Sequence, residues 1–208
     1  PYRNILSFPA SSWPSFRGDP QNTGCTTASQ APKEIMQEII WSKPGDSSID
    51  CAVVGEGGKI YVGYFDKKLL CLDGESGKEL WTLRTDGGIV CSPTIFMGKL
   101  YFSTWQKTFY CVNAETGEKE WERKAEITTP VICSGDLLFY GTASGKIVCE
   151  SIASKKTMWT FETGQTIAFA CPTIFEGKVC LGDWGGTLHC LDQKTGRETW
   201  SFKAGGAI

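Results

Sequence analysis

The sequence predicts an all-β fold built from four copies of one four-stranded unit, and three features of the chain support this prediction. Five tryptophans recur at spacings of 40, 40, 38 and 41 residues, namely Trp41, Trp81, Trp121, Trp159 and Trp200. Four cysteines keep the same period, each ten residues before a tryptophan, namely Cys71, Cys111, Cys149 and Cys190. Between them lie short β-rich runs broken by glycine, without the apolar period of a helix. Such a unit of about forty residues is typical of a β-propeller blade.

Four blades and one extension account for the whole chain. We expect the blades over residues 49–88, 89–126, 127–166 and 167–206, after an N-terminal extension over residues 1–38 that packs on the propeller. The second unit shows the pattern best, with strands expected over 90–96, 99–103, 108–112 and 118–123. Tight turns rich in glycine, asparagine and threonine separate these strands.

A turn motif precedes the repeating tryptophan in most units. An Asp or Asn side chain bonds the backbone two residues further on, and a glycine supplies positive φ. The tryptophan is then expected to bury its rings between blades. The motif residues are Asp73, Gly77, Trp81, Asn113, Gly117, Trp121, Trp159, Asp192, Gly196 and Trp200. The third copy, from Ser151 to Lys155, lacks the acidic residue and the glycine, so we expect blade three to have the least regular turn.

The segment around Trp41 predicts an incomplete ring. Residues Ile39 to Lys43 read as an outermost strand without the rest of a blade, and four full units follow. Four blades lie at the low end of the known range of about four to eight. We therefore expect a ring of seven or eight blades, whose missing blades come from a longer chain or from a second copy.

Over these residues the chain resembles the pyrroloquinoline-quinone-like (PQQ-like) propeller repeat family, whose pattern is roughly A-x-D-x-x-T-G-x-x-x-W. The segment from Cys71 to Trp81 is close to this pattern, and the resemblance covers residues 39–208. The opening segment from Trp13 to Gly24 is similar to one that often precedes the first blade in this family.

The resemblance implies two kinds of function. Quinoprotein dehydrogenases in the family bind PQQ with Ca²⁺ and oxidise alcohols or sugars, whereas the outer-membrane assembly lipoprotein and its relatives use the propeller as a protein-binding scaffold. The resemblance also implies that a dehydrogenase would often contain two adjacent cysteines joined in a ring disulfide. This chain has no such pair and is far shorter than the dehydrogenases. We therefore favour a non-catalytic scaffold without a cofactor. The alternatives are a fragment of a PQQ-dependent alcohol or sugar dehydrogenase and the sensor domain of a larger signalling protein, so enzymatic activity stays open.

The turns between the second and third strands contain the candidate partner site. Phe65, Trp105 and Trp184 occupy one aligned position in these turns. In a propeller, these turns share a face with the blade-to-blade connections. Because binding hot spots are rich in aromatic residues, we expect a protein or peptide partner on this face. The competing interpretation is that each ring folds over its neighbouring blade.

The residues for catalysis or metal binding are sparse. His189 is the only histidine, so neither a catalytic triad nor a zinc site is predicted. A strand histidine of this kind is more often a half-buried packed residue. Asp183 beside Trp184 comes nearest to the acid and aromatic ring that a quinoprotein site would need. The expected interpretation of these two residues is an ordinary exposed turn. We predict no catalytic and no metal-binding residue.

The ten cysteines are interpreted as small buried apolar residues, because no C-x-x-C occurs. Cys180 and Cys190 are the exception, since they flank one hairpin and can face each other. Many reduced thiols favour the cytoplasm, whereas the family resemblance favours the periplasm or the cell surface, so the location stays open.

The charge balance excludes a nucleic-acid partner held by bulk charge. The 21 basic residues face 23 acidic ones, and no basic run occurs. No apolar stretch is long enough to cross a membrane.

Overall fold

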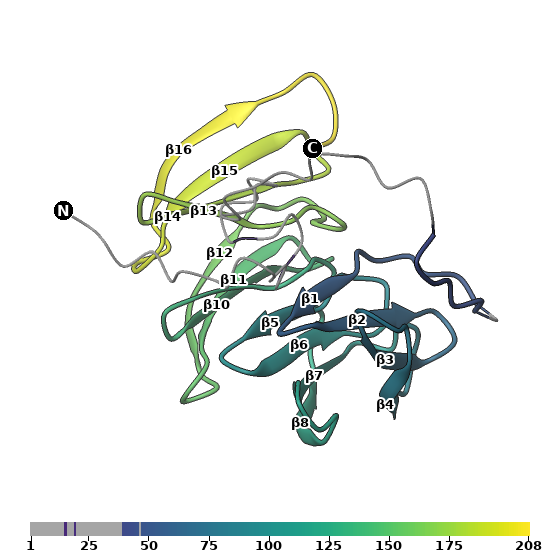
Figure 1. Cartoon of the computed structure of the whole chain (residues 1–208). Coiled ribbons are helices and arrows are strands. Elements are labelled where there is room, and N and C mark those ends of the chain that lie inside the picture. The colour runs from purple at the N-terminus through teal and green to yellow at the C-terminus, as the bar shows by residue number, and fades with distance from the viewer. Residues whose placement is uncertain (1–14, 16–18, 20–38, 46) are drawn as a thin grey trace, which may run out of the picture.

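The structure, a computed structural model, describes residues 15, 19, 39–45 and 47–208. Within this part, the regular elements are sixteen strands in four separate four-stranded antiparallel sheets. The sheets follow one another in an arc, with β4 and β16 at opposite ends (Figure 1). The prediction of an all-β propeller with four four-stranded blades is confirmed. The predicted packing of the extension over residues 1–38 lies outside the described residues, apart from Ser15 and Asp19.

Each blade is a meander in which neighbours in sequence are neighbours in the sheet. Blade one has β1 (Val54–Glu56), β2 (Lys59–Tyr64), β3 (Lys68–Asp73) and β4 (Glu79–Arg84). Blade two has β5 (Thr94–Phe96), β6 (Lys99–Ser103), β7 (Thr108–Asn113) and β8 (Lys119–Lys124). Blade three has β9 (Ile132–Ser134), β10 (Leu137–Gly141), β11 (Lys146–Ser151) and β12 (Thr157–Glu162). Blade four has β13 (Thr173–Phe175), β14 (Lys178–Gly182), β15 (Thr187–Asp192) and β16 (Glu198–Lys203).

The innermost strand of blade two is shorter than the apolar run predicted over 90–96. The strand begins at Thr94, directly after Pro93, which has no N–H to donate to a ladder. Ile89 instead forms an isolated bridge with Thr104. Residues 90–93 therefore connect blades one and two rather than extending β5. The inner strands lie side by side, with β5 in contact with both β1 and β9.

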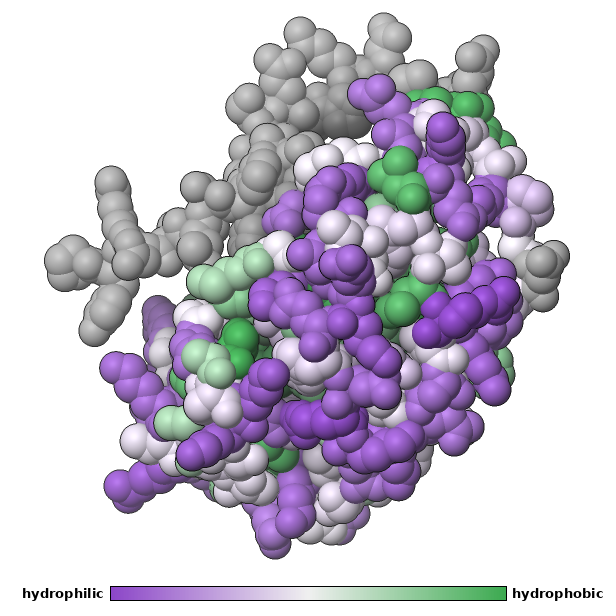
Figure 2. All heavy atoms as spheres, turned by 90° about the horizontal axis from the view of Figure 1, so that it is seen from below, coloured by the Kyte–Doolittle hydropathy of each residue, from purple (hydrophilic) through white to green (hydrophobic). Residues whose placement is uncertain are grey.

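Three of the four hydrophobic clusters among the described residues lie between blades, and the fourth lies on blade one against Trp41. One cluster joins Leu69 of blade one to Leu100 and Phe102 of blade two, and two further clusters join blades two to three and three to four. The outermost strands of blades one to three alternate between exposed and half-buried residues. Hydrophilic side chains accordingly predominate on the face shown in Figure 2, where hydrophobic ones form small separate patches. The described part of the chain contains no helix that could cross a membrane.

An indole packed on a glycine joins successive blades. A Cβ added to Gly117 would lie 2.6 Å from Cδ2 of Trp81, so the indole lies directly against the glycine backbone. The indole Nε1 of Trp81 donates to the carbonyl oxygen of Ala114 at 3.2 Å. Trp159 of blade three makes the same pair of contacts with Gly196 and Gln193 of blade four.

The glycine also favours the conformation of the turn. Gly117 has φ +75° and donates its N–H to the carbonyl of Asn113 at 2.9 Å. The Asn113 side chain accepts the backbone N–H of Thr116 at 3.0 Å, and Asp73 and Asp192 cap their turns in the same way. Only glycine combines this left-handed backbone with an open surface for the incoming ring.

Blade three keeps the backbone of this turn, so the expectation that its turn is the least regular is wrong. Lys155 takes the glycine position with φ +57°, and its N–H donates to the carbonyl of Ser151 at 2.8 Å. The hydroxyl of Ser151 replaces the missing carboxylate by accepting the N–H of Ser154 at 3.1 Å. The Lys155 ammonium lies 5.1 Å from the ring centre of Trp121. A cation–π contact with the indole therefore replaces the glycine contact of the other blades.

The predicted outermost strand over residues 39–43 is wrong, because these residues form no strand. An outermost strand needs inner strands to pair with, and the described chain has none beside this segment. The Trp41 side chain nevertheless packs on blade one as the other indoles pack on their neighbours. It lies against Gly77, and its Nε1 donates to the carbonyl of Gly74 at 3.0 Å.

Blade four presents to solvent the face that points away from blade three, which we call its outer face. Trp200 is 45% exposed, and Phe202 and Phe175 are also exposed. The equivalent Trp81, Trp121 and Trp159 are half-buried because a following blade packs on each.

We predict that Gly117→Ala destabilises the chain more than Gly98→Ala does. Both glycines have φ of 70–75°, so each alanine costs roughly 1–2 kcal/mol in backbone strain. Only the Cβ at position 117 meets an indole, whereas nothing lies within 4 Å of one at position 98. Overpacking adds about 1–3 kcal/mol to the loss at 117. Urea unfolding measures both losses, and equal values would show that the indole contact does not hold the blades together.

Candidate functional site

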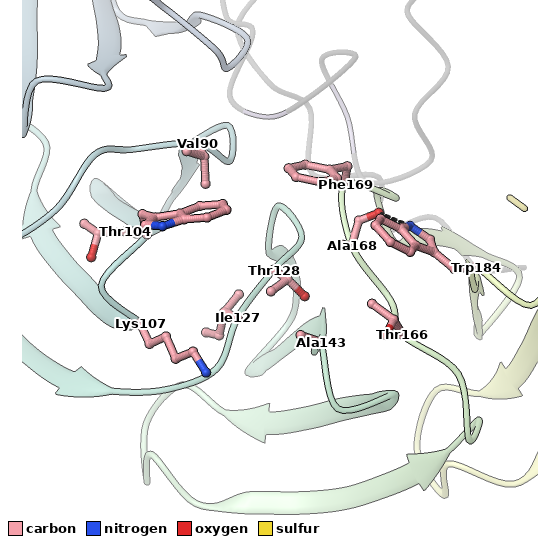
Figure 3. A pocket seen from close by; sticks show the side chains of 11 residues that line it. Val90, Thr104, Lys107, Ile127, Thr128, Ala143, Thr166, Ala168, Phe169 and Trp184 are labelled. Atoms are coloured by element: carbon pink, nitrogen blue, oxygen red, sulfur yellow. Dashed lines mark hydrogen bonds between the residues drawn. The ribbon is translucent and has the colours of Figure 1, made fainter.

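A cavity of about 390 Å³ opens among the turns and blade connections of blades two, three and four. It has mostly apolar walls, and we call it the aromatic cleft. Its lining residues are Val90, Thr104, Trp105, Lys107, Ile127, Thr128, Ala143, Thr166, Ala168, Phe169 and Trp184. Figure 3 shows Ile127, Thr128 and Ala143 between the Val90 side of the cleft and the Trp184 side.

A single small residue in blade three leaves room for the cleft. Ala143 occupies the turn position that holds Trp105 in blade two and Trp184 in blade four. The two tryptophans are 62% and 54% exposed, so their rings stand out from the blades beside the gap. A third large ring at position 143 would occupy the space between them.

The turn carrying Trp105 is held in place by hydrogen bonds. The N–H of Trp105 donates to the carbonyl of Gly88 at 2.8 Å. Asp86, on the connection from blade one, accepts the hydroxyl of Thr104 at 2.8 Å and the ammonium of Lys124 at 3.0 Å. The hydroxyl of Thr108 also donates to this carboxylate. These bonds tie the beginning and the end of the turn to one carboxylate.

The same contacts determine the ionisation of Asp86. Partial burial favours the neutral acid, but the hydrogen bonds from Thr108, Lys124 and Thr104 outweigh it and lower the pKa of Asp86 to about 2. The carboxylate is therefore charged at any pH above about 4, and it positions the Trp105 turn throughout the neutral range.

The turn carrying Trp184 is likewise held by a carboxylate, that of Asp183. Asp183 is buried, so the expectation of an ordinary exposed turn is wrong for this residue, although Trp184 is exposed. One Asp183 oxygen accepts the N–H of Thr187 at 2.8 Å, and the other lies 3.0 Å from Nε2 of His189. Nδ1 of His189 lies 2.8 Å from Glu198. The histidine is therefore a buried structural residue, more buried than predicted, which links the turn to β16.

Backbone bonds place the Trp184 ring. The N–H of Trp184 donates to the carbonyl of Thr166 at 2.9 Å, as that of Trp105 does to Gly88. The indole Nε1 of Trp184 donates to the carbonyl of Ala168 at 3.3 Å, drawn as a dashed line in Figure 3. The ring is thus oriented by one hydrogen bond at its edge, which leaves its faces available.

Phe169 adds a third ring to the cleft. It has φ +63°, a left-handed conformation that is unfavourable for a bulky side chain. Its N–H donates to the carbonyl of Thr128 at 3.0 Å, which holds the connection in this conformation. The side chain is 63% exposed although it is apolar. Strained residues of this kind gather at binding sites, where the surrounding structure keeps them in place.

The structure brings together two of the three predicted partner-binding residues. Trp105 and Trp184 both line the aromatic cleft, whereas Phe65 lies outside it, beside Gly88. Sequence reasoning missed Phe169 and Ala143. The repeat alignment carried a signal for Ala143, since it is the one small residue at a position otherwise occupied by aromatic rings. No sequence signal marked the left-handed conformation of Phe169.

A second cavity, of about 150 Å³, lies near the inner strands. It is lined by Cys51, Cys91 and Cys171 together with Asp50 and Phe169, among others. Burial raises the pKa of Cys51 to about 11 and that of Cys91 to about 12, so these thiols are neutral and weakly nucleophilic at physiological pH. Within the described residues, no group of three His, Cys, Asp or Glu side chains is arranged to hold a metal ion.

The inner cysteines are less regular than their spacing predicted. Cys71, Cys111, Cys149 and Cys190 pair across the sheet with the repeating tryptophans, as equivalent residues should. Cys133, in contrast, lies inside β9, whereas Cys91 precedes β5 and Cys171 precedes β13. Cys133 lies one residue after the start of its strand, whereas Cys91 lies three residues before and Cys171 two residues before, so the period alone made unequal positions look equivalent.

The chain matches a protein family described as outer membrane protein assembly factor BamB over residues 36–133 and 124–207. No curated protein matches it.

Solved structures share the fold at low sequence identity. BamB from Moraxella catarrhalis is 20% identical with a TM-score of 0.70, over 80% of this chain and 53% of that one. Quinohemoprotein alcohol dehydrogenase from Comamonas testosteroni is 14% identical with a TM-score of 0.77, over 96% and 42%. The computationally designed Ika8 protein is 14% identical with a TM-score of 0.66, over 75% and 50%. The chain thus spans about half the length of these proteins.

We predict that Asp86→Asn reduces stability at neutral pH by about 1 kcal/mol, the loss of one charge-assisted bond at a partly exposed site. A folded pKa near 2, below the ordinary value of 3.8, adds stability that is present above about pH 4 and lost as the pH falls toward 2. The gap between wild type and variant should therefore close over this range. Urea unfolding at several pH values measures it, with exposed Glu75→Gln as the charge control. A gap that stays constant down to pH 2 would contradict the assigned role of Asp86.

Proposed function

The chain belongs to the protein family described as outer membrane protein assembly factor BamB, and we propose that it is a non-catalytic propeller scaffold whose aromatic cleft binds an apolar side chain of a protein or peptide partner. The observation that carries this proposal is the cleft between Trp105 and Trp184 that Ala143 leaves open. The description of the family as an outer membrane protein assembly factor supports a protein partner.

The size and chemistry of the cleft favour an apolar anchor. Its volume of about 390 Å³ falls within the range of ligand pockets, about 300–1,000 Å³. Lys107 is the one charged side chain among its lining residues, and its ammonium pairs with Glu126 at 2.9 Å. Three exposed rings held by backbone bonds lose little freedom on binding, which favours affinity.

The alternative is a fragment of a PQQ-dependent dehydrogenase. The likeness to the Comamonas enzyme supports it only at the level of the fold. The residues that line the aromatic cleft and the second cavity suit this cofactor poorly. PQQ carries three carboxylates, and Ca²⁺ takes six to eight oxygen ligands. Around the two cavities the charged groups are Lys107 and Asp50. This donor set suits an apolar group better than a polyanion with a calcium ion.

We also propose that further blades complete the ring. The exposed outer face of blade four, with Trp200, Phe202 and Phe175, has the apolar character of the covered faces of the other blades. A following blade with a glycine turn would cover Trp200 as Gly117 covers Trp81. The additional blades would come from a longer chain or from a second copy.

A native mass spectrum of the protein isolated from its source tests ring completion. We expect either a polypeptide heavier than the 22.8 kDa of this chain or a dimer of it. A stable monomer of 22.8 kDa would contradict the proposal, because its outer face would then be exposed in the native protein.

Fluorine NMR of the chain labelled with 5-fluorotryptophan tests the binding proposal. We expect the Trp105 and Trp184 resonances to shift on titration with acetyl-Ala-Phe-Ala-amide and to stay unchanged with acetyl-Ala-Asp-Ala-amide. A single apolar anchor predicts a Kd on the order of 1 mM. Ala143→Trp should weaken binding at least tenfold, because the new ring fills the cleft.

Phe65→Ala is the matched control, since Phe65 is exposed at the same repeat position but lies outside the cleft. It should leave the affinity unchanged. Trp105→Ala should abolish the peptide-induced shift of the remaining Trp184 resonance. It should change the free energy of unfolding by about 0.5 kcal/mol or less, as exposed substitutions do. Equal responses to the two peptides, or full affinity in Ala143→Trp, would overturn the proposal.

A further inference from the structure

Blade four carries a pair of thiols where the other blades carry a thiol facing an aromatic ring. On the second and third strands of blades one to three, the facing pairs are Tyr61 with Cys71, Tyr101 with Cys111, and Phe139 with Cys149. In blade four, Cys180 of β14 faces Cys190 of β15. Their sulfur atoms lie 2.7 Å apart, so the two side chains point at each other.

The backbone at this position can accommodate a bond between the sulfurs. Directly opposed residues on antiparallel strands have Cα atoms about 4.5 or 5.5 Å apart, depending on the type of pair. Disulfides span Cα distances of about 4.4–6.8 Å. Cys180 and Cys190 are opposed in this way, with the ladder continuing on both sides at Val179 and Leu181. A disulfide therefore requires no rearrangement of the sheet.

The thiol pair is reachable in a way that its counterparts are not. Tyr61 is buried, and its hydroxyl donates to the carbonyl of Ala114 in the next blade at 3.1 Å. Cys180 occupies the equivalent position in blade four but is only partly buried, and Cys190 is buried behind it. Among the described residues no blade follows blade four, so in the isolated chain an oxidant in solution reaches Cys180 first, with Cys190 in position to respond. The proposed further blade would cover this position, so the reaction belongs to the chain before that blade packs on it.

We propose that Cys180 and Cys190 form a cross-strand disulfide when the chain meets a small disulfide oxidant of the glutathione type. The Cys180 thiolate attacks one sulfur of the oxidant, which forms a mixed disulfide and releases one reduced thiol. The Cys190 thiolate then attacks the Cys180 sulfur, which forms the protein disulfide and releases the second reduced thiol. The two cysteines lose two electrons and two protons, and the oxidant gains them.

The two steps differ in speed. Burial, together with the hydrogen bond and charge of Cys190, raises the pKa of Cys180 to about 12, so little thiolate is present for the first attack at neutral pH. The second attack is intramolecular between sulfurs already in contact, and proximity of this kind gives a large advantage. The mixed disulfide should therefore not accumulate, and the overall rate should rise with pH.

Mass spectrometry of the alkylated chain tests the proposal. The chain is equilibrated with oxidised glutathione at pH 8.5, unfolded in guanidinium chloride, alkylated and digested. We expect eight of the ten cysteines to be alkylated and one linked peptide to join Cys180 to Cys190. The reduced chain should be alkylated at all ten. Thermal unfolding should show a rise in Tm of roughly 3–8 °C on oxidation.

Two variants keep the result interpretable. Cys180→Phe restores the ring that faces the thiol in blade three, so it should fold, form no linked peptide and show no rise in Tm. Cys149→Ser changes the equivalent thiol of blade three and should leave the linkage intact. Alkylation of all ten cysteines after oxidation, glutathione retained on Cys180, or a link from Cys180 to another cysteine would each overturn the proposal.

Discussion

The packing of an outer-strand indole on the left-handed glycine of the next turn determines how the sheets stack. Because glycine has no Cβ, the six-membered ring of Trp81 lies against the Gly117 backbone while its Nε1 reaches the carbonyl of Ala114. Trp41 on Gly77 and Trp159 on Gly196 repeat this geometry. Three core clusters consequently lie between blades, and a fourth lies between blade one and Trp41. Blade three shows that the glycine itself can be replaced, provided that the residue there, Lys155, keeps positive φ and interacts with the ring.

This regular stacking also creates the aromatic cleft. Because each blade packs on the next with the same geometry, the equivalent turns of all blades lie on one face. The shape of the cleft then depends on which side chains those turns carry. Trp105 and Trp184 form its sides because Ala143 leaves the intervening position small. Asp86 and Asp183 hold the two turns, and Thr128 holds the connection that carries Phe169. The cleft is therefore formed before any partner arrives, as the proposed scaffold function requires.

The fold could be predicted almost completely from the sequence, and the cleft only in part. The strands of blade two were found to within a few residues because its turns carry glycine, asparagine and threonine, whose backbone preferences are local. Trp105 and Trp184 were found for the same reason. Phe65 lies elsewhere because the cleft forms around blade three, and that depends on contacts between blades. The burial of Asp183 and the conformation of Phe169 arise from long-range hydrogen bonds, which have no local signature. Residues 39–43 have a strand-like pattern but lack a sheet to join.

Hydrogen exchange at the indole N–H groups tests the indole contact most directly, because it requires no substitution. In a ¹⁵N-labelled chain, the indole protons of Trp41, Trp81 and Trp159 each donate to a carbonyl of the following blade. We predict that they exchange slowly, with rates governed by opening of the blade interface. In the monomeric chain, where no further blade covers it, the exposed indole of Trp200 should exchange at a rate close to that of an unfolded peptide. Exchange at Trp81 and Trp159 as fast as at Trp200 would contradict the account of how the blades are held together.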